Sequence, residues 1–298
     1  MVGGRFCVYA VATPYAWDVV ESARESWGAW PQDSDVAPLE FRVLVEPGGE
    51  LTGAPAFRKQ AHLLSFVSDA HNFAVADAAT LTASFHLAEK TAADRTLLRW
   101  YYLDALAYML LTQRYVISLH AACVARNGCG ILLGGPSGAG KSTLSVACAR
   151  AGFTFVADDC TWVLTGTDER IAIGKPHQVR LRHDAVRHFP ELEGHTQRVL
   201  PNGKLSMEAP TSIFTGIRTA RRVPVGSVVF LNRTGFGQAS IQRIASEDAF
   251  ELLLADLPSY GAEVNAAHER TVASLAELPA WRLSYCDLDD AIRLLSGI

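Results

Sequence analysis

A glycine-rich segment near the middle of the chain has the residue types that hold phosphate groups. Gly135-Pro136-Ser137-Gly138-Ala139-Gly140-Lys141-Ser142 matches the pattern GxxxxGK[ST], where x is any residue. The apolar segment Gly130–Leu133 before it predicts a strand, and Ser142–Ala151 after it predicts a helix. Glycines let backbone amides face an anion, and the positive end of a helix dipole adds to the attraction. In this context the motif predicts a site for a nucleoside triphosphate.

The motif also assigns roles to individual side chains. Lys141 is expected to bridge the β- and γ-phosphates of ATP, and the hydroxyl of Ser142 is expected to ligate Mg²⁺. The expected nucleotide-binding residues are Gly135, Pro136, Ser137, Gly138, Ala139, Gly140, Lys141, Ser142 and Thr143. Two other classes of nucleotide-binding protein fit less well. Transporter-type ATPases carry an LSGGQ-like signature, which the chain lacks, and GTPases carry an NKxD-type segment, whose acid is missing from Leu231-Asn232-Arg233-Thr234.

Two adjacent carboxylates follow the expected helix. Asp158 and Asp159 end the apolar segment Phe153–Ala157, which predicts a strand beside the one that precedes the glycine-rich loop. One carboxylate can organise Mg²⁺, a role assigned to Asp158, and the other can accept a proton from an attacking hydroxyl. A solvated turn is the alternative, but the position at the end of an apolar strand favours a functional pair.

His120 lies in a second apolar segment that is expected to approach the same site. Val116–Ala125 and Gly130–Leu133 flank Asn127-Gly128, a dipeptide typical of a tight hairpin turn. Such a hairpin can bring His120 to the phosphate end of the sheet, where contact with an aspartate would tune an acidic base. A histidine in an apolar strand is also often a core residue, so the residues alone leave both interpretations open.

Together these features resemble the catalytic domain of HPr kinase/phosphorylase and the wider group of HPr-kinase-like serine kinases. The resemblance covers roughly residues 120–159. It implies that Asp159 is the base that accepts a seryl proton, that His120 assists it, and that Lys141 and Ser142 serve phosphate and Mg²⁺. It also implies an α/β fold, an HPr-kinase-like P-loop domain related to phosphoenolpyruvate carboxykinase, and it allows a homo-oligomer.

The resemblance leaves the phosphoryl acceptor open. The family carries a Glu in a segment beyond the acidic pair, and residues 172–180 show no clear Glu; its Pro-Gly-Arg-Asn segment is not reproduced near Arg221–Pro224. The wider group includes kinases of lasso-peptide precursors, so the acceptor can be a carrier protein or a precursor peptide. The predicted function is ATP·Mg²⁺-dependent transfer of the γ-phosphoryl group to a hydroxyl, expected to be that of a serine. A nucleotide-gated regulatory module and a slow ATPase are the alternatives.

The rest of the chain divides into two parts. Residues 1–92 alternate short apolar runs with turn residues and predict a small β-rich accessory domain. From Ala93 onward, apolar residues recur at helical spacing over about 18–20 residues. The domain boundary is therefore expected at 92/93, with the kinase-like domain over 93–298. Strands are expected at Phe6–Thr13, Phe41–Val45, His71–Val75, Ser84–Leu87, Ile171–Ile173, Val179–Arg182, Val225–Leu231 and Trp281–Cys286. Further helices are expected at Ser246–Ala255, Ala266–Glu277 and Asp287–Ser296.

Charge and composition exclude several classes of protein. Lys and Arg number 27 against 31 Asp and Glu, a net charge of −4, which argues against nucleic-acid binding through bulk positive charge. No run reaches the ~18–20 apolar residues of a membrane helix, and the start of the chain does not fit a secretory signal. The six cysteines show no zinc-type spacing and are expected to be reduced thiols. A cytoplasmic protein is expected.

Several charged residues form a second group of candidates. Gly174–Arg182 contains Lys175, His177, Arg180 and Arg182, and the segment Pro201–Glu208 contains Lys204 and Glu208. Such side chains can clamp a transferring phosphoryl group, although solvated loop charges are commoner. Arg218, Arg221 and Arg222 form a basic patch that could meet an acidic partner.

Overall fold

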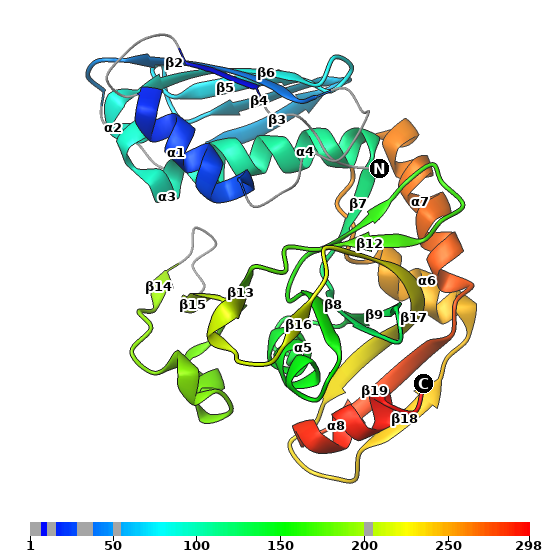
Figure 1. Ribbon diagram of the computed structural model, residues 1–298. Coiled ribbons are helices and arrows are strands. Elements are labelled where there is room, and N and C mark those ends of the chain that lie inside the picture. The colour runs from blue at the N-terminus through cyan, green and yellow to red at the C-terminus, as the bar shows by residue number, and fades with distance from the viewer. Residues whose placement is uncertain (1–6, 11–15, 29–37, 50–54, 200–204) are drawn as a thin grey trace. The chain divides into compact units, whose positions relative to one another are not determined.

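The computed structural model describes residues 7–10, 16–28, 38–49, 55–199 and 205–298 (Figure 1). The chain divides into two compact units, Met1–Tyr115 and Val116–Ile298. The helical segment that follows residue 93, which the sequence assigns to the second domain, therefore belongs to the first. No helix of the described ranges is long and apolar enough to span a bilayer.

The described residues of the first unit form a six-stranded sheet with one face buried under helices. The strand order is β1-β2-β6-β5-β4-β3. The strands are β1 (Cys7–Ala10), β2 (Glu40–Glu46), β3 (Ala56–Gln60), β4 (Leu63–Val67), β5 (Phe73–Asp77) and β6 (Thr82–Ala88). The helical segments are α1 (Ala16–Trp27), α2 (Glu89–Ala93), α3 (Arg95–Leu97), the π-helical η1 (Leu98–Asp104) and α4 (Ala105–Arg114). Burial alternates along β2, β5 and β6, as expected where one sheet face packs on a core. β1, β2, β5 and β6 overlap the strands expected in this part of the chain, whereas α1, β3 and β4 were not expected.

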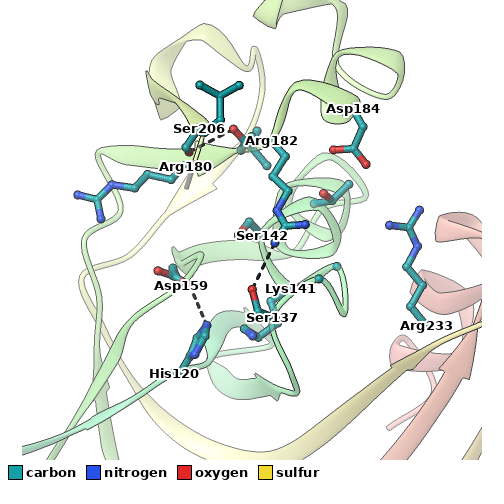
Figure 2. A pocket seen from close by; sticks show the side chains of 15 residues that line it. His120, Ser137, Lys141, Ser142, Asp159, Arg180, Arg182, Asp184, Ser206 and Arg233 are labelled. Atoms are coloured by element: carbon teal, nitrogen blue, oxygen red, sulfur yellow. Dashed lines mark hydrogen bonds and ion pairs between the residues drawn. The ribbon is translucent and has the colours of Figure 1, made fainter. Parts of the chain in front are cut away.

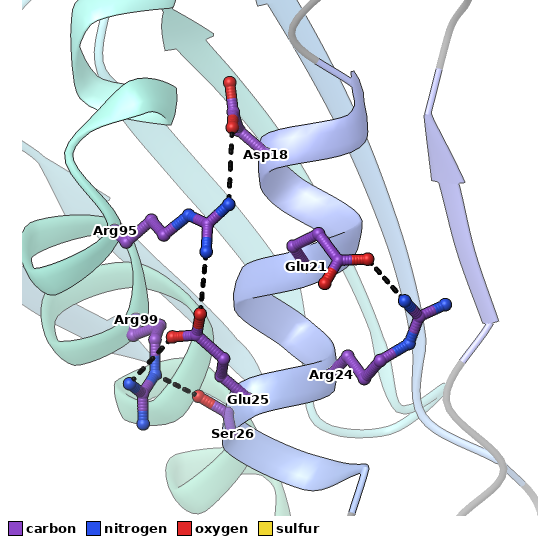
Figure 3. A network of polar contacts seen from close by, with 7 residues as sticks. All are labelled: Asp18, Glu21, Arg24, Glu25, Ser26, Arg95 and Arg99. Atoms are coloured by element: carbon purple, nitrogen blue, oxygen red, sulfur yellow. Dashed lines mark hydrogen bonds and ion pairs between the residues drawn. The ribbon is translucent and has the colours of Figure 1, made fainter.

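Packing against α1 explains why η1 and α4 belong to the first unit. Tyr102 and Leu106 are fully buried in the same apolar cluster as Val19 and Trp27 of α1. At the surface, Arg95 and Arg99 both pair with Glu25 of α1, at 2.8 and 3.1 Å (Figure 3). Exposed ion pairs contribute at most about 1 kcal/mol each, so the buried apolar contacts supply most of the stability.

The second unit contains a large mixed sheet between two pairs of helices. Within residues 116–199 and 205–298, the main strand order is β16-β10-β8-β9-β17-β12-β11-β7, and β19 pairs with both β17 and β18. The strands are β7 (Val116–Leu119), β8 (Ala122–Arg126), β9 (Cys129–Gly134), β10 (Thr154–Ala157), β11 (Thr161–Leu164), β12 (Ile171–Ile173), β16 (Arg218–Thr219), β17 (Arg222–Arg233), β18 (Ser240–Arg243) and β19 (Ala280–Tyr285).

Successive residues of the central strands pack on opposite layers. Leu132 and Val228 lie in an apolar cluster with α6 (Ser246–Leu254) and α7 (Ala262–Ala276). Leu133 and Val229, one residue further along each strand, lie in a cluster with α5 (Lys141–Arg150) and α8 (Leu288–Leu295). This continuous burial is typical of strands covered on both faces.

A smaller sheet and several short helical turns pack against the outer side of α5. The sheet consists of β13 (Gln178–Leu181), β15 (Leu205–Pro210) and β14 (Arg198–Val199). The turns are η2 (His183–Arg187), η3 (Pro190–Leu192) and η4 (Thr211–Ile213). Val179 and Met207 share an apolar cluster with Val146 of α5, so the small sheet is held against this helix.

The strand pairing corrects two expectations about the site. The hairpin at Asn127-Gly128 forms, with φ of 51° and 82°, but the expected strand Val116–Ala125 is broken at His120-Ala121 into β7 and β8. The strand before the acidic pair, β10, was expected beside β9. Instead β8 lies between them, and β10 pairs antiparallel with β8.

Gly174 lies where β12 leads into β13, directly against the end of β10. A Cβ at this position would overlap the carbonyl oxygen and carbon of Val156, two residues before Asp158. We expect Gly174→Ala to lower the free energy of unfolding by about 1–3 kcal/mol, because the backbone must move apart. Chemical denaturation measures this. Gly235→Ala is the matched control, since a Cβ there meets nothing within 4 Å; equal effects of both changes would contradict the prediction.

Candidate active site

The glycine-rich loop connects β9 to α5 and adopts a conformation that requires glycine. Gly135, Gly138 and Gly140 have φ of 142°, 92° and 92°, and Gly140 is the residue before the first turn of α5. L-amino acids with side chains rarely adopt such values. The strand–loop–helix arrangement therefore agrees with the sequence, and it places the positive end of the α5 dipole at the loop.

Lys141 lies across this loop. Lys141 is only 5% exposed, and its Nζ donates to the carbonyl oxygens of Gly135 and Pro136, at 2.6 and 3.3 Å. A buried ammonium requires such acceptors because desolvation is costly. The lysine thus presents a fixed positive charge inside the loop, where an anion can take the place of the carbonyl acceptors.

Tyr285, at the end of β19, supports the other side of the loop. Its hydroxyl donates to the Ala139 carbonyl oxygen at 2.8 Å, and a Cβ at Gly140 would overlap that hydroxyl. Burial raises the pKa of Tyr285 to about 12, so the phenol stays a donor at neutral pH. This role could not be predicted from the sequence, because a tyrosine that ends an apolar strand carries no motif.

Tyr285→Phe tests the support of the loop. Without the phenol, the buried Ala139 carbonyl loses its donor, and leaving such a group unpaired costs about 1–3 kcal/mol. We expect thermal unfolding at a lower temperature and nucleotide affinity several-fold weaker, measured by calorimetry on the same sample. Unchanged values for both would show that the hydrogen bond does not hold the loop.

His120 and Asp159 face each other across two matching breaks in the sheet. Leu119 pairs with Thr161, and Cys123 pairs with Ala157, so residues 120–122 lie opposite residues 158–160. His120 Nε2 is 3.1 Å from Asp159 Oδ1, and the two side chains are 39% and 53% exposed (Figure 2). The structure therefore brings together two residues that the sequence could only propose as neighbours.

The two aspartates have pKa values displaced in opposite directions. The hydrogen bond from His120 is the largest cause that holds the pKa of Asp159 below its usual value, and Lys141 adds to it. Burial is the largest cause that raises the pKa of Asp158 to about 7, and the charge of Asp159 raises it further. Adjacent carboxylates that differ in this way can carry different roles in one reaction.

Asp158 contacts the backbone of the small sheet. Its Oδ2 accepts a hydrogen bond of 2.7 Å from the Arg180 amide, and its own carbonyl accepts one of 3.3 Å from the Ser142 hydroxyl. Ser142 and Asp158, the expected metal ligands, are thus neighbours, although the hydroxyl reaches the main chain of Asp158 and not its carboxyl group. No group of three or more His, Cys, Asp or Glu side chains suited to a metal occurs among the described residues.

Three arginines line the same cavity as Lys141 (Figure 2). Arg182 donates to the hydroxyl of Ser137 in the glycine-rich loop at 3.3 Å. Arg180 pairs with Glu208 at 3.1 Å. The third, Arg233 at the end of β17, was not expected from the sequence. The feature that could have indicated it is its position at the carboxyl end of a strand parallel to β9.

The other charged candidates are placed differently. Lys175 and His177 are absent from the described lining of the cavity, and Lys204 lies outside the described residues. Arg218 donates to the Gly152 carbonyl, at the far end of α5, and Arg222 begins β17. The cavity itself combines four cations, from Lys141 and the three arginines, with the carboxylates Asp159 and Asp184. Its charge suits a polyanion such as a triphosphate.

Comparison with known proteins gives a distant likeness among solved structures and none among family models or curated proteins. Among solved structures, the chain is similar to the Hpr(Ser) kinase/phosphatase from Coxiella burnetii, with 11% sequence identity and a TM-score of 0.32 over 60% of this chain and 91% of that chain. The likeness is a distant one and concerns the fold alone.

Proposed function

We propose that the second unit is a kinase-like phosphotransferase that takes a phosphoryl group from ATP and passes it to a hydroxyl, expected to be that of a serine. One observation carries the proposal. The His120–Asp159 pair stands in the same cavity as the glycine-rich loop, the buried Lys141 and three arginines. A base beside a phosphate-binding loop is the arrangement that phosphoryl transfer to a hydroxyl requires.

The residues fit both ATP and a magnesium ion. The glycine cradle at the start of α5 and Lys141 suit the phosphates, because backbone conformation and charge both favour an anion there. Ser142 and Asp158 would hold Mg²⁺, which prefers a few protein oxygens together with phosphate and water. When bound, this ion would supply neutralisation of charge on the phosphates.

The proposed step follows from the positions of the side chains. Asp159 accepts the proton of the acceptor hydroxyl, and His120 keeps the carboxylate oriented through the 3.1 Å contact. The hydroxyl oxygen forms a bond to the γ-phosphorus as the bond between that phosphorus and the β,γ-bridging oxygen breaks, and ADP leaves. Lys141 and the arginines stabilise the charge that gathers on the departing phosphate.

The acceptor is proposed to be a protein or peptide. Both His120 and Asp159 are open to solvent, so a side chain from another molecule can reach the base. The same exposure favours a second candidate, a slow ATPase, because water can reach the base as well. A nucleotide sensor without turnover is the third.

One experiment separates these functions. The protein is incubated with ATP labelled at the γ-phosphate, Mg²⁺, and a peptide library with one fixed Ser, Thr or Tyr per peptide. Label on serine peptides supports the kinase, and free phosphate alone supports the ATPase. Bound ATP without turnover supports the sensor. Absence of ATP binding would overturn the proposed function.

A further inference from the structure

We propose that the base of the bound nucleotide stacks on Phe236, in the loop after β17, at the opposite end of the cavity from the His120–Asp159 pair. The inference names a base-binding subsite and rests on the proposed function. It is carried by the sheet topology, the anchoring of this loop and the exposure of its aromatic side chain.

The direction in which the nucleotide lies follows from the position of the proposed catalytic base, Asp159. The γ-phosphate must lie next to Asp159 if that carboxylate is to serve the attacking hydroxyl. The remaining phosphates, the ribose and the base must then extend away from the pair. Figure 2 shows Arg233 on the far side of Lys141 from Asp159. The ribose and base are therefore expected beyond Arg233.

The topology places a loop at this end. The strands on one side of β9, β8 and β10, end beside His120 and Asp159, whereas β17 and β19 on the other side run parallel to β9. Phe230 pairs with Gly134, the last residue of β9, yet β17 continues to Arg233. The strand thus projects past the start of the glycine-rich loop, at the sheet edge where α/β proteins bind ligands.

The loop after β17 is anchored to the residues that support the glycine-rich loop. The Thr234 amide donates to the Tyr285 carbonyl at 2.8 Å, and the Cys286 thiol donates to the Gly237 carbonyl at 3.3 Å. Tyr285 in turn holds the Ala139 carbonyl. The two loops are therefore tied to one strand end, which fixes the position of one relative to the other.

Phe236 has the chemistry of a base-binding residue. It is 89% exposed, and the flanking Gly235 and Gly237 leave open space, since a Cβ at either would meet nothing within 4 Å. A planar base can approach an aromatic ring in such a setting and remove its faces from water. Stacking of this kind accepts any nucleobase. It is therefore expected to strengthen the binding of ATP and to discriminate little between ATP and other nucleoside triphosphates.

The test compares ATP with inorganic tripolyphosphate, which has the phosphates but lacks ribose and base. Binding of each is measured by calorimetry with Mg²⁺. We expect Phe236→Ala to weaken ATP about 5- to 100-fold and to leave tripolyphosphate unchanged, whereas Phe236→Trp keeps ATP affinity. Leu252→Ala, which removes an exposed apolar side chain from α6, is the control and is expected to change neither. In Phe236→Trp, ATP but not tripolyphosphate should change the tryptophan fluorescence, by more than the change that ATP causes in the wild type.

Each other outcome has a definite meaning. Equal loss of both ligands in Phe236→Ala, or no loss of ATP, overturns the inference. Equal affinity of the wild type for ATP and tripolyphosphate also overturns it, and leaves the phosphate site of the proposed function standing. Failure of the folded wild type to bind either ligand overturns the proposed function and the inference with it.

Discussion

Lys141→Ala is expected to weaken ATP binding by about 10- to 100-fold, measured by calorimetry with Mg²⁺. A charge-assisted hydrogen bond contributes about 1.5–3 kcal/mol, and Lys141 donates to two carbonyls of the glycine-rich loop, where the phosphates are expected to bind. The remaining positive charges, from Arg180, Arg182 and Arg233, line the cavity at other positions and are not expected to replace it.

The substitution also removes a buried donor, so folding must be checked separately. Lys141→Met keeps the length of the stem and serves as a second variant if Lys141→Ala unfolds. Lys90→Ala, an exposed change in α2 of the first unit, is the control and should bind ATP as the wild type does. An unchanged ATP affinity in folded Lys141 variants would remove the glycine-rich loop as the nucleotide site.

The sequence predicted the parts of the site that depend on local order. The loop from Gly135 to Gly140 needs particular backbone angles, and only glycine adopts them at low cost, so spacing alone indicated the strand, loop and helix. The acidic pair was indicated by its position directly after the apolar segment Phe153–Ala157. Strand boundaries in this region agreed within a few residues, because buried strands read as apolar runs bounded by turns.

The contact between His120 and Asp159 could not be derived in this way. The contact forms because the break between β7 and β8 lies opposite the break between β10 and β11. This alignment is set by the pairing register of two segments that are distant in the sequence. The same limit explains the misplaced β10, because the connection through α5 returns the chain next to β8 and not β9. Arg233 and Tyr285 were missed because single residues at strand ends carry no pattern.

The first unit shows a different limit. β3 is an edge strand whose side chains are almost all exposed, so Ala56–Gln60 lacks the alternation that reveals a strand. The strong apolar spacing of the long helical segment predicts a boundary before it, but periodicity does not tell which core the apolar face joins. Burial of Tyr102 and Leu106 beside α1 decides it.

Asp159→Asn is expected to lower the rate of phosphoryl transfer about 10²- to 10⁴-fold, the usual contribution of a positioned general base, while ATP still binds. The amide keeps the shape of the side chain but cannot take the hydroxyl proton. Its measurement is transfer of labelled phosphate at saturating ATP, alongside ATP affinity by calorimetry. Asp168→Asn, which removes one exposed carboxylate away from the cavity, is the control for net charge.

The pH dependence adds a readout that loss of folding would not imitate. Because the hydrogen bond from His120 is the largest cause that lowers the pKa of Asp159, the carboxylate stays ionised further into the acidic range than an ordinary aspartate, and its protonation does not limit activity near neutrality. In His120→Ala that support is lost, so the acidic limb of the rate profile should move to higher pH while ATP affinity changes little. Undiminished transfer by Asp159→Asn would exclude this carboxylate as the base, and an unmoved acidic limb in His120→Ala would show that the 3.1 Å contact does not set its basicity.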